Sequence, residues 1–435
     1  MKQKTILLWF RNDLRLHDNV IVHEAVRKNA LVIPVYCFNP FFYRKTKIGT
    51  LKTGSFRSRF IFESVLALRE NLREKGTDLA IVIGKPEEEI CKLAIKYNVE
   101  DVYVHQEVAS EENIEMEKVE KALWKHRIPL TSFIGHTLYH KQDLPFPIRD
   151  IPDTFTLFRK KIEKETTVRE EYPSPEKMES PFFEEINHLP DLNTLALKLD
   201  VEIPKFENQF PGGENHALAR LNYYLWEADL IKNYKVTRNN LLGNDCSTKL
   251  SPYLSAGCIS PRRIYHEVKK YESERIANDS TYELIFELLW RDYFRFMFKK
   301  HGNKFFQESG FQKKTLSFSI DQKESFEKWK DGKTGIPFID ACMIELNTTG
   351  FMSNSGRQNA ASFLVKNLQV NWTWGACYFE EKLIDYSPSS NWGNWASIAG
   401  VGNEPGKNGL FSVEKQAKDY DPDGTFTQYW NNLLN

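Results

Sequence analysis

The sequence has few cysteines, and no two of them are closely spaced. Its 435 residues include six cysteines, and no two have the Cys-x-x-Cys spacing of zinc or redox sites. Scattered cysteines of this kind predict reduced, mostly buried thiols and a cytoplasmic protein. The stretch HTLYH, with His136 and His140, has a spacing that a metal could use. It stands alone, however, so the sequence favours a protein without a metal site.

Long apolar runs and an excess of charge are also missing. No apolar run approaches the roughly 20 residues that a membrane-spanning helix needs, so we expect no membrane partner. The N-terminal TILLWF is too short for the hydrophobic part of a signal peptide. Basic and acidic residues balance at 59 each. Counterion release needs clustered Lys and Arg, so any binding of nucleic acid must use a local patch.

The first third of the chain alternates strand and helix patterns. Near-continuous apolar strands separated by amphipathic helices are typical of a doubly wound parallel sheet with helices on both faces. No Gly-x-Gly-x-x-Gly follows the first strand, which argues against a standard dinucleotide site there. We therefore predict an α/β domain over residues 1–134. The strands are expected at residues 5–10, 31–38, 79–84 and 101–105, and the helices at 18–29, 60–76 and 86–98.

The remaining chain divides into a connector and a helical domain. Residues 135–210 are charged, weakly periodic and rich in proline, which predicts a long surface connector with one short helix at 154–165. From residue 211 to 435 the pattern is helical almost throughout, and Gly302 and Gly350 mark two helix ends. The fold class is thus α/β plus all-α.

Hydroxyl groups precede one predicted helix of this domain. The segment CSTKLSPYLSAGCISPRR places Ser247, Thr248 and Ser251 directly before Pro252. Ser251 and Pro252 suit the N-cap and first helical positions, and hydroxyls beside a helix N-terminus favour a bound phosphate. An ordinary capped helix would have the same sequence.

Two other segments of the helical domain combine charge with aromatic or amide groups. In FELLWRDYF, Glu287, Trp290 and Arg291 share one helix face. A carboxylate beside an indole could read a base edge and stack on it, although a surface ion pair over a half-buried Trp fits equally. In TGFMSNSGRQNAASF, Arg357 begins a helix with Asn354. Its possible partner is Asp385, and a structural salt bridge is the simplest interpretation of that pair.

Tryptophan is concentrated in one short segment. Residues 370–400 contain Trp372, Trp374, Trp392 and Trp395, four of the ten tryptophans in the chain. Leu and Phe usually supply the apolar mass of a core, so core packing alone does not explain this concentration of indoles.

Taken together, these segments resemble the photolyase and cryptochrome family, and most closely its cryptochrome DASH branch. Seven blocks that look like those of the branch occur in its order between residues 7 and 430. They are LLWFRNDLRLHDN, STKLSPYLSAGCISPR, FELLWRDYFRF, ELNTTGFMSN, RQNAASFLVKNL, IDYSPSSNWGNWASIAGVGNEP and KQAKDYDPDG.

The resemblance implies a folded FAD in the helical domain. Its phosphates would be held by Tyr234, Ser247, Thr248, Lys249, Leu250 and Ser251. The isoalloxazine would be surrounded by Asn354, Arg357, Asp385, Ser387 and Asn391. An amide at position 391, near the N5 edge, favours an anionic reduced flavin, as in repair enzymes, whereas plant cryptochromes carry an acid there.

The activity implied is light-driven repair of cyclobutane pyrimidine dimers without a metal. The dimer must leave the base stack, as for the photolyases among base-flipping enzymes. Single-stranded DNA is the preferred partner in this branch, and we expect a monomer. Glu287 would hydrogen-bond the dimer and Trp290 would pack on it, with Asn391 completing the catalytic set. The DNA contacts would also include Arg238, Arg291 and Gln358.

Two further roles follow from the resemblance. Gln106 and Glu107 are similar to the polar pair that holds a methenyltetrahydrofolate antenna, although an exposed strand-end pair would look alike. Trp395 and Trp372 match the inner and middle members of an electron-transfer chain that reduces the oxidised flavin. Trp374 and Trp392 are assigned to packing.

Three positions depart from the family pattern. Phe318 or Ser319 stands where the outermost Trp of the chain belongs, which puts photoreduction in doubt unless Trp374, Trp329 or a tyrosine gives a detour. Ser355 replaces an Arg expected to contact DNA, and Ser387 replaces an Asp close to the flavin. These departures keep open a blue-light receptor or regulatory nucleic-acid binder with little repair activity, and a divergent flavoprotein without a light reaction.

Overall fold

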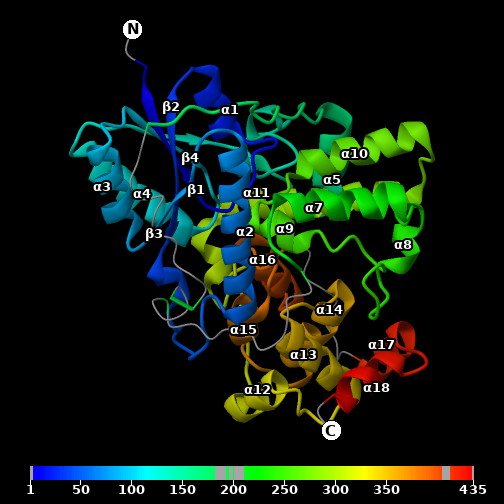
Figure 1. Cartoon of the computed structure of the whole chain (residues 1–435). Coiled ribbons are helices and arrows are strands. Elements are labelled where there is room, and N and C mark those ends of the chain that lie inside the picture. The colour runs from blue at the N-terminus through cyan, green and yellow to red at the C-terminus, as the bar shows by residue number, and fades with distance from the viewer. Residues whose placement is uncertain (1–2, 182–192, 195–198, 200–209, 404–411, 434–435) are drawn as a thin grey trace.

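The N-terminal part of the chain folds around a parallel sheet, drawn in blue to cyan in Figure 1. The computed structural model describes residues 3–181, 193–194, 199, 210–403 and 412–433. In the described residues the sheet has five strands in the order β3-β2-β1-β4-β5, and each neighbouring pair is parallel. The strands are β1 (Thr5–Phe10), β2 (Leu31–Phe38), β3 (Ala80–Ile83), β4 (Asp101–His105) and β5 (Leu130–Phe133).

Helices cover both faces of this sheet, because successive side chains of a strand point to opposite faces. Ile6 and Leu8 of β1 share a cluster with α1 and α2, whereas Leu7 and Trp9 share one with α3 and α4. The predicted α/β fold and its four strands are confirmed. Strand β5 and helix α4 were not predicted. The helices are α1 (Val20–Arg27), α2 (Ser55–Glu74), α3 (Pro86–Lys96) and α4 (Ser110–Trp124).

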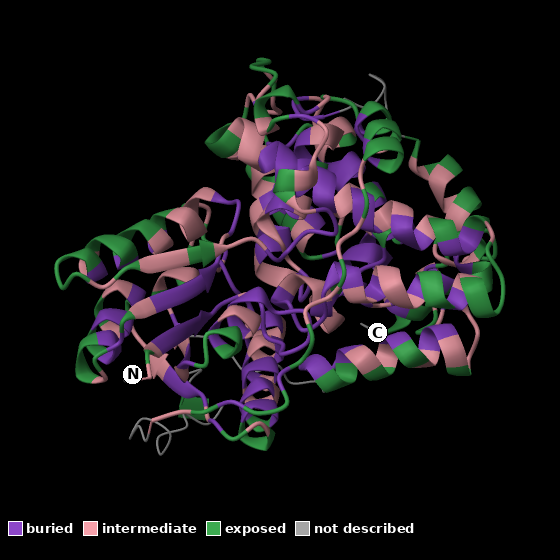
Figure 2. Ribbon diagram, turned by 90° about the horizontal axis from the view of Figure 1, so that it is seen from above, coloured by how far each residue is buried: buried purple, intermediate pink, exposed green. Residues whose placement is uncertain are grey.

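The second part of the molecule is helical, as predicted, and lies beside the sheet part in Figure 1. Purple buried segments run through the middle of both parts in Figure 2. Its helices are α7 (Glu214–Asn222), α8 (Tyr234–Thr237), α9 (Ser251–Ala256), α10 (Pro261–Glu274), α11 (Asp279–His301), α12 (Gln322–Lys330), α13 (Pro337–Thr349), α14 (Asn354–Ser362), α15 (Trp372–Lys382), α16 (Pro388–Ile398), α17 (Val413–Tyr420) and α18 (Thr425–Asn432).

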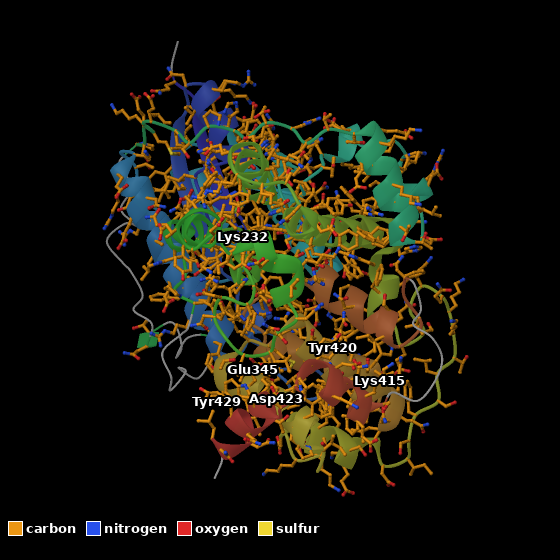
Figure 3. The ribbon with its side chains drawn as sticks, turned by 90° about the vertical axis from the view of Figure 1, so that its right-hand side faces the viewer. Lys232, Glu345, Lys415, Tyr420, Asp423 and Tyr429 are labelled. Atoms are coloured by element: carbon orange, nitrogen blue, oxygen red, sulfur yellow. The ribbon has the colours of Figure 1, made fainter. Side chains whose placement is uncertain are left out.

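Helix α11 is central to this part because it contacts α8, α10 and α16, and also α5 (Phe155–Glu165) of the connector. A capping box at Asn278 starts it, and Gly302 ends it with a φ of 56°, which favours glycine. At the far end of the molecule α13 packs against α17 and α18. In Figure 3, Glu345 of α13 lies near Asp423 and Tyr429, well apart from Lys232.

The predicted connector contains α5 (Phe155–Glu165), which confirms the short helix. Residues 182–192, 195–198 and 200–209 of the connector lie outside the described residues, as do Glu404 and Pro405, the last two residues of the sixth family block. The division into 1–134, 135–210 and 211–435 stays a prediction. No helix among the described residues is long and apolar enough to cross a membrane.

The two parts are joined by polar contacts of the loop after β1. The carboxylate of Glu214, at the start of α7, accepts hydrogen bonds from the backbone N–H groups of Leu16 and His17 and contacts the His17 ring. Arg15 donates to the carbonyl of Gly257, just after α9. These buried bonds fix the sheet part against the helices that carry the candidate site.

Candidate functional site

A pocket in the helical part gathers most of the residues predicted around the flavin ring. It lies between α14, α16 and the segment that joins α15 to α16. The tertiary structure therefore brings together residues that the sequence places on separate segments. The lining includes Asn354, Arg357, Gln358, Asp385, Ser387, Asn391 and Trp395.

The buried carboxylate of Asp385 organises this pocket. Its Oδ2 accepts hydrogen bonds from Arg357 Nη2 at 2.8 Å and from the Ser251 hydroxyl at 2.6 Å. Its Oδ1 is buried and has no hydrogen-bond partner in the described part of the chain. A buried acceptor without a partner is unfavourable, so this oxygen fits a bound group that offers an N–H or O–H. A flavin ring offers an N–H, and its ribityl chain offers O–H groups.

Helix α9 begins one residue earlier than predicted. Leu250 occupies the N-cap position without a side-chain hydrogen bond, and Ser251 is the first helical residue. The predicted N-cap role of Ser251 is therefore wrong, because its hydroxyl is used by Asp385 instead. The preceding residue, Lys249, has a φ of 55°, and this left-handed conformation turns the chain into the helix.

The loop before α9 is held by Arg220 of α7, which the sequence analysis missed. Its guanidinium donates to the carbonyls of Asn244, Ser247 and Thr248 and to the carboxylate of Asp245, at 2.9 to 3.0 Å. Most of these partners are backbone carbonyls more than twenty residues away, so no spacing in the sequence could reveal them. Arg220 fixes the predicted phosphate-binding loop in shape.

Two ionisable groups, the half-buried Lys249 and the buried Glu345, lie beside this loop. Burial lowers the pKa of the Lys249 ammonium, which lies over the ring of Phe351 at 4.5 Å. Burial raises the pKa of Glu345 to about 8, although Lys249 and Arg357 act in the opposite direction. Its Oε2 lacks a hydrogen-bond partner among the described residues. A half-buried lysine that forms no ion pair with the described residues suits an added anion such as a phosphate.

Tyr234, Ser387 and Asn391 occupy distinct places around the site. Tyr234 begins α8 and is buried beside Tyr224, with ring centroids 6.4 Å apart, so it is not part of the pocket lining. Ser387 is the residue before α16, and its hydroxyl is 3.4 Å from that of Ser389. Asn391 donates from Nδ2 to the carbonyl of Ala376 at 3.0 Å, which fixes the orientation of its amide in the pocket.

Glu287 and Trp290 share a face of α11, as predicted. Arg238, which the resemblance implies as a phosphate contact, forms ion pairs with Glu287 and with Glu283. Trp290 is stacked on Phe155 of α5 at a centroid distance of 3.7 Å. Its ring is also 5.7 Å from that of Phe294.

Phe294 connects this face to the pocket, because it lies against Gly393 of α16 so closely that a Cβ there would clash. Trp290 is therefore linked by packing to the helix that carries Asn391.

Arg291 does not join the predicted DNA contacts. Its guanidinium donates to the carbonyls of His136 and Leu254, and burial lowers its pKa to about 10. The side chain lines the cavity between the two parts of the molecule. The structure thus corrects the prediction and assigns Arg291 to the junction of the two parts.

Gln358 and Ser355 differ in their access to solvent. Gln358 and Asn354 are exposed at the edge of the pocket. Ser355 is 3% exposed, and its hydroxyl is 3.4 Å from the side-chain oxygen of Asn239, which is exposed. An arginine at position 355 would have to pass Asn239 to reach DNA.

The tryptophans form two groups of ring contacts. Trp395 lines the pocket around Asp385 and contacts Trp329 at 6.2 Å between centroids. Trp372 contacts Trp392 at 5.7 Å and donates from its indole nitrogen to the carbonyl of Glu308. Phe318 and Ser319 are both half-buried, and Ser319 donates its N–H to Gln369.

A second and larger cavity, of about 850 Å³, lies between the sheet part and the helical part. Glu107 lines it and is 3% exposed. The Glu107 carboxylate accepts hydrogen bonds from Arg295 at 2.7 Å and Asn12 at 3.0 Å. Gln106 accepts one from Lys299 at 2.8 Å. The predicted antenna pair is thus located at the junction of the two parts, with both side chains bonded to neighbours.

Comparisons with known proteins agree with this architecture. Residues 6–177 match the family model described as DNA photolyase, and residues 284–435 match the FAD binding domain of DNA photolyase. The chain is 47% identical to a cryptochrome DASH from Gloeobacter violaceus over 99% of the chain and 86% of that protein.

Two solved structures are also similar. The Synechocystis cryptochrome covers 99% of the chain and 89% of its own, with 45% identity and a TM-score of 0.93. The archaeal photolyase from Sulfolobus tokodaii, solved with two FAD molecules, covers 98% and 90%, with 28% identity and a TM-score of 0.78.

The parallel sheet, the helical part and its pocket define a protein with the photolyase fold and an FAD-binding domain. With 46–47% identity to relatives over 98–99% of the chain and 83–87% of theirs, the chain belongs to the cryptochrome DASH branch of the photolyase and cryptochrome family. The predicted family and fold are confirmed.

Proposed function

We propose that this protein repairs cyclobutane pyrimidine dimers in DNA with light, and prefers single-stranded DNA. The observation that carries the proposal is the packing of Phe294, a ring neighbour of Trp290 on α11, against Gly393 of α16, the helix whose Asn391 lines the candidate flavin pocket. The protein could therefore bind a base edge and a flavin at adjacent sites. When bound, FAD in its reduced form would supply the electron that splits the dimer.

The residues of the chain would bind and orient. Arg357 and Asp385 would hold the flavin ring, and Lys249, with the loop held by Arg220, would face the phosphates. Glu287 would accept or donate a hydrogen bond to the flipped dimer after exchanging its bond with Arg238. The flat ring of Trp290, already backed by Phe155, would pack on the bases.

The test is direct illumination of the purified, chemically reduced protein with oligothymidine that contains dimers. Recovery of thymine absorbance, lost in Glu287→Ala and kept in the exposed control Arg149→Ala, supports repair. Bound FAD without any recovery of thymine would refute it.

A second chromophore belongs to this proposal. Gln106 and Glu107 would take part in holding methenyltetrahydrofolate at the junction of the two parts, where a cavity is present. The archaeal photolyase solved with two FAD molecules supports a second chromophore in this fold. Mass spectrometry of small molecules released by denaturation would identify folate or show only FAD.

The alternative is a light receptor or regulatory nucleic-acid binder of the cryptochrome type. It is favoured by the buried Ser355 and by the pairing of Arg238 with two glutamates, which leaves fewer cations for phosphate. In that case DNA binding would persist while the illuminated, reduced protein left the dimers intact.

A further inference from the structure

Helix α8 and the first half of α11 carry opposite charges where they pack together. The ammonium of Lys235 donates to the carboxylate of Asp279 at 3.0 Å. About one turn further along each helix, Arg238 forms ion pairs with Glu283 and Glu287. Asp279, Glu283 and Glu287 follow one another at intervals of four residues, so they share one face of α11. An acidic face of α11 thus binds the basic side chains of α8.

Arg238 is shared by two carboxylates through a single nitrogen atom. Its Nη1 lies 3.2 Å from Oε1 of Glu283 and also contacts Oε1 of Glu287. Burial raises the pKa of Glu287, and Glu283 acts in the same direction, whereas Arg238 opposes both. The guanidinium therefore offsets the repulsion between two carboxylates one helical turn apart. With both of them ionised, two negative charges face one positive charge.

Arg238 lies at the surface edge where the resemblance places DNA. Its side chain is 19% exposed, and the next residue along the chain, Asn239, is exposed. The side-chain oxygen of Asn239 also lies 3.4 Å from the hydroxyl of Ser355, the position at which an arginine was expected. Arg238 can therefore donate to a phosphate here only by giving up bonds to its glutamates.

A DNA phosphate would compete with these glutamates for the guanidinium. Two carboxylates oppose the single charge of one phosphate, so Arg238 stays with the protein when the DNA offers nothing else. A dimer that hydrogen-bonds Glu287 changes this balance, because Glu283 alone then competes with the phosphate. Counterions released from the DNA favour the phosphate in that case.

We propose that Glu283 is a positioning residue that withholds Arg238 from DNA phosphate until a dimer engages Glu287. The proposal rests on the proposed function, in which Glu287 binds the dimer. Because one guanidinium serves both sites, the dimer contact and the phosphate contact favour each other, which is a coupling between two binding sites. Glu283 thereby makes tight binding depend on the presence of a dimer, although it touches neither the dimer nor the phosphate.

The variant Glu283→Gln tests whether Glu283 restrains Arg238. FAD-loaded protein is titrated in the dark with labelled, undamaged oligothymidine at several salt concentrations, and fluorescence anisotropy gives the affinity and its salt dependence. The variant should bind on the order of tenfold more tightly, the value of one charged hydrogen bond. The salt slope should steepen by about 0.7, which corresponds to one phosphate contact on a single strand. The substitution keeps the side-chain shape and removes a like-charge pair with Glu287, so the variant should fold.

Two further variants control for charge and for the route of the effect. Asp279→Asn makes the same change of charge on the same helix face, at a side chain that is 87% exposed and paired with Lys235. It should leave the salt slope unchanged. In an Arg238→Gln background, Glu283→Gln should no longer steepen the slope. An unchanged slope in Glu283→Gln, an equal increase in Asp279→Asn, or an increase that survives Arg238→Gln would overturn the proposal.

The same titration with an oligothymidine that carries one dimer separates this proposal from repair. In the parent protein the slope should be steeper with the dimer than without it by about 0.7, and in Glu283→Gln the two slopes should coincide. A parent protein that prefers the dimer but has equal slopes overturns the coupling and leaves repair standing. A parent protein with the expected slopes that restores no thymine absorbance under light refutes repair and supports the coupling.

Discussion

At the scale of single residues, Asp385 is the side chain on which the candidate flavin site depends most. Its carboxylate is buried, and Oδ2 accepts hydrogen bonds from Arg357 and Ser251. Its Oδ1 has no hydrogen-bond partner among the described residues. Removing one partner of a buried ion pair leaves an uncompensated charge. The pair is thus a sensitive position for cofactor retention as well as for stability.

We predict that Arg357→Ala weakens FAD binding by up to about 3 kcal/mol, or roughly a hundredfold in Kd, through the unpaired Asp385. Fluorescence titration of the apoprotein with FAD measures the change. Arg149→Ala is the matched control, because Arg149 has an 85% exposed side chain paired with its neighbour Asp150. Unchanged FAD affinity in Arg357→Ala would place the flavin elsewhere.

Glu345 gives a prediction for pH. Burial raises its pKa from 4.5 to about 8 in the folded protein, so the folded state holds a proton that the unfolded state has released. Its contribution to stability is therefore full below pH 4.5 and is lost as the pH rises through about 8. Glu345→Gln stays neutral and should lose less stability than the parent between pH 6 and pH 9. Thermal unfolding of both apoproteins across this range measures the difference. Parallel curves would show that Glu345 titrates normally.

At the scale of elements, the loop before α9 depends on a residue of another helix. Arg220 holds three of its carbonyls and one carboxylate, and a planar guanidinium with several donors is suited to this geometry. Lysine keeps the positive charge but replaces the planar guanidinium with a single ammonium group.

We therefore predict that both Arg220→Ala and Arg220→Lys increase hydrogen exchange over residues 243–250 in the apoprotein. Both should also release FAD more readily than the parent. A variant of similar chemistry outside the loop, Arg73→Lys on α2, should change neither measurement, since Arg73 is bonded to Asp78, away from this loop. If Arg220→Lys behaves like the parent, charge alone orders the loop.

The predicted elements were confirmed where the apolar pattern was strong. Strands β1, β2 and β4 are runs of buried side chains, and each was expected within a residue or two. β5 was missed because its LTSF has no fully buried residue, and α4 because it buries only Glu115, Val119 and Leu123. Both lie at the sheet edge or on an outer face, where burial imposes little pattern.

At the scale of the whole molecule, the form of the DNA is the testable feature. Drawing a dimer out of a duplex costs a few kcal/mol more than from a single strand. Arg238 is engaged by glutamates, and Ser355 offers no cation. We predict faster repair of dimers in single strands than in duplexes of the same sequence, measured by thymine absorbance under equal illumination. Equal rates would show that duplex flipping is not limiting.

Ser355→Arg tests the same feature from the protein side. If the new guanidinium passes Asn239, it should tighten binding to both forms and steepen the salt dependence by about one phosphate contact. Fluorescence anisotropy at several salt concentrations measures both quantities. An unchanged slope would mean that position 355 remains closed to DNA.

The family, the two kinds of fold and the chemical groups of the candidate flavin pocket could all be predicted from the sequence. Ordered blocks and apolar runs are local features, and Arg357, Asp385 and Asn391 could be named from them. The contacts that these side chains make could be found only from the way the helices pack together. The Ser251 hydroxyl donates to Asp385 instead of capping its helix, and Arg291 lies at the junction of the two parts. Arg220 holds the loop before α9, and the ring of Trp395 contacts that of Trp329. Each of these contacts links residues distant in the chain, and their packing depends on how whole helices meet, which no local pattern encodes.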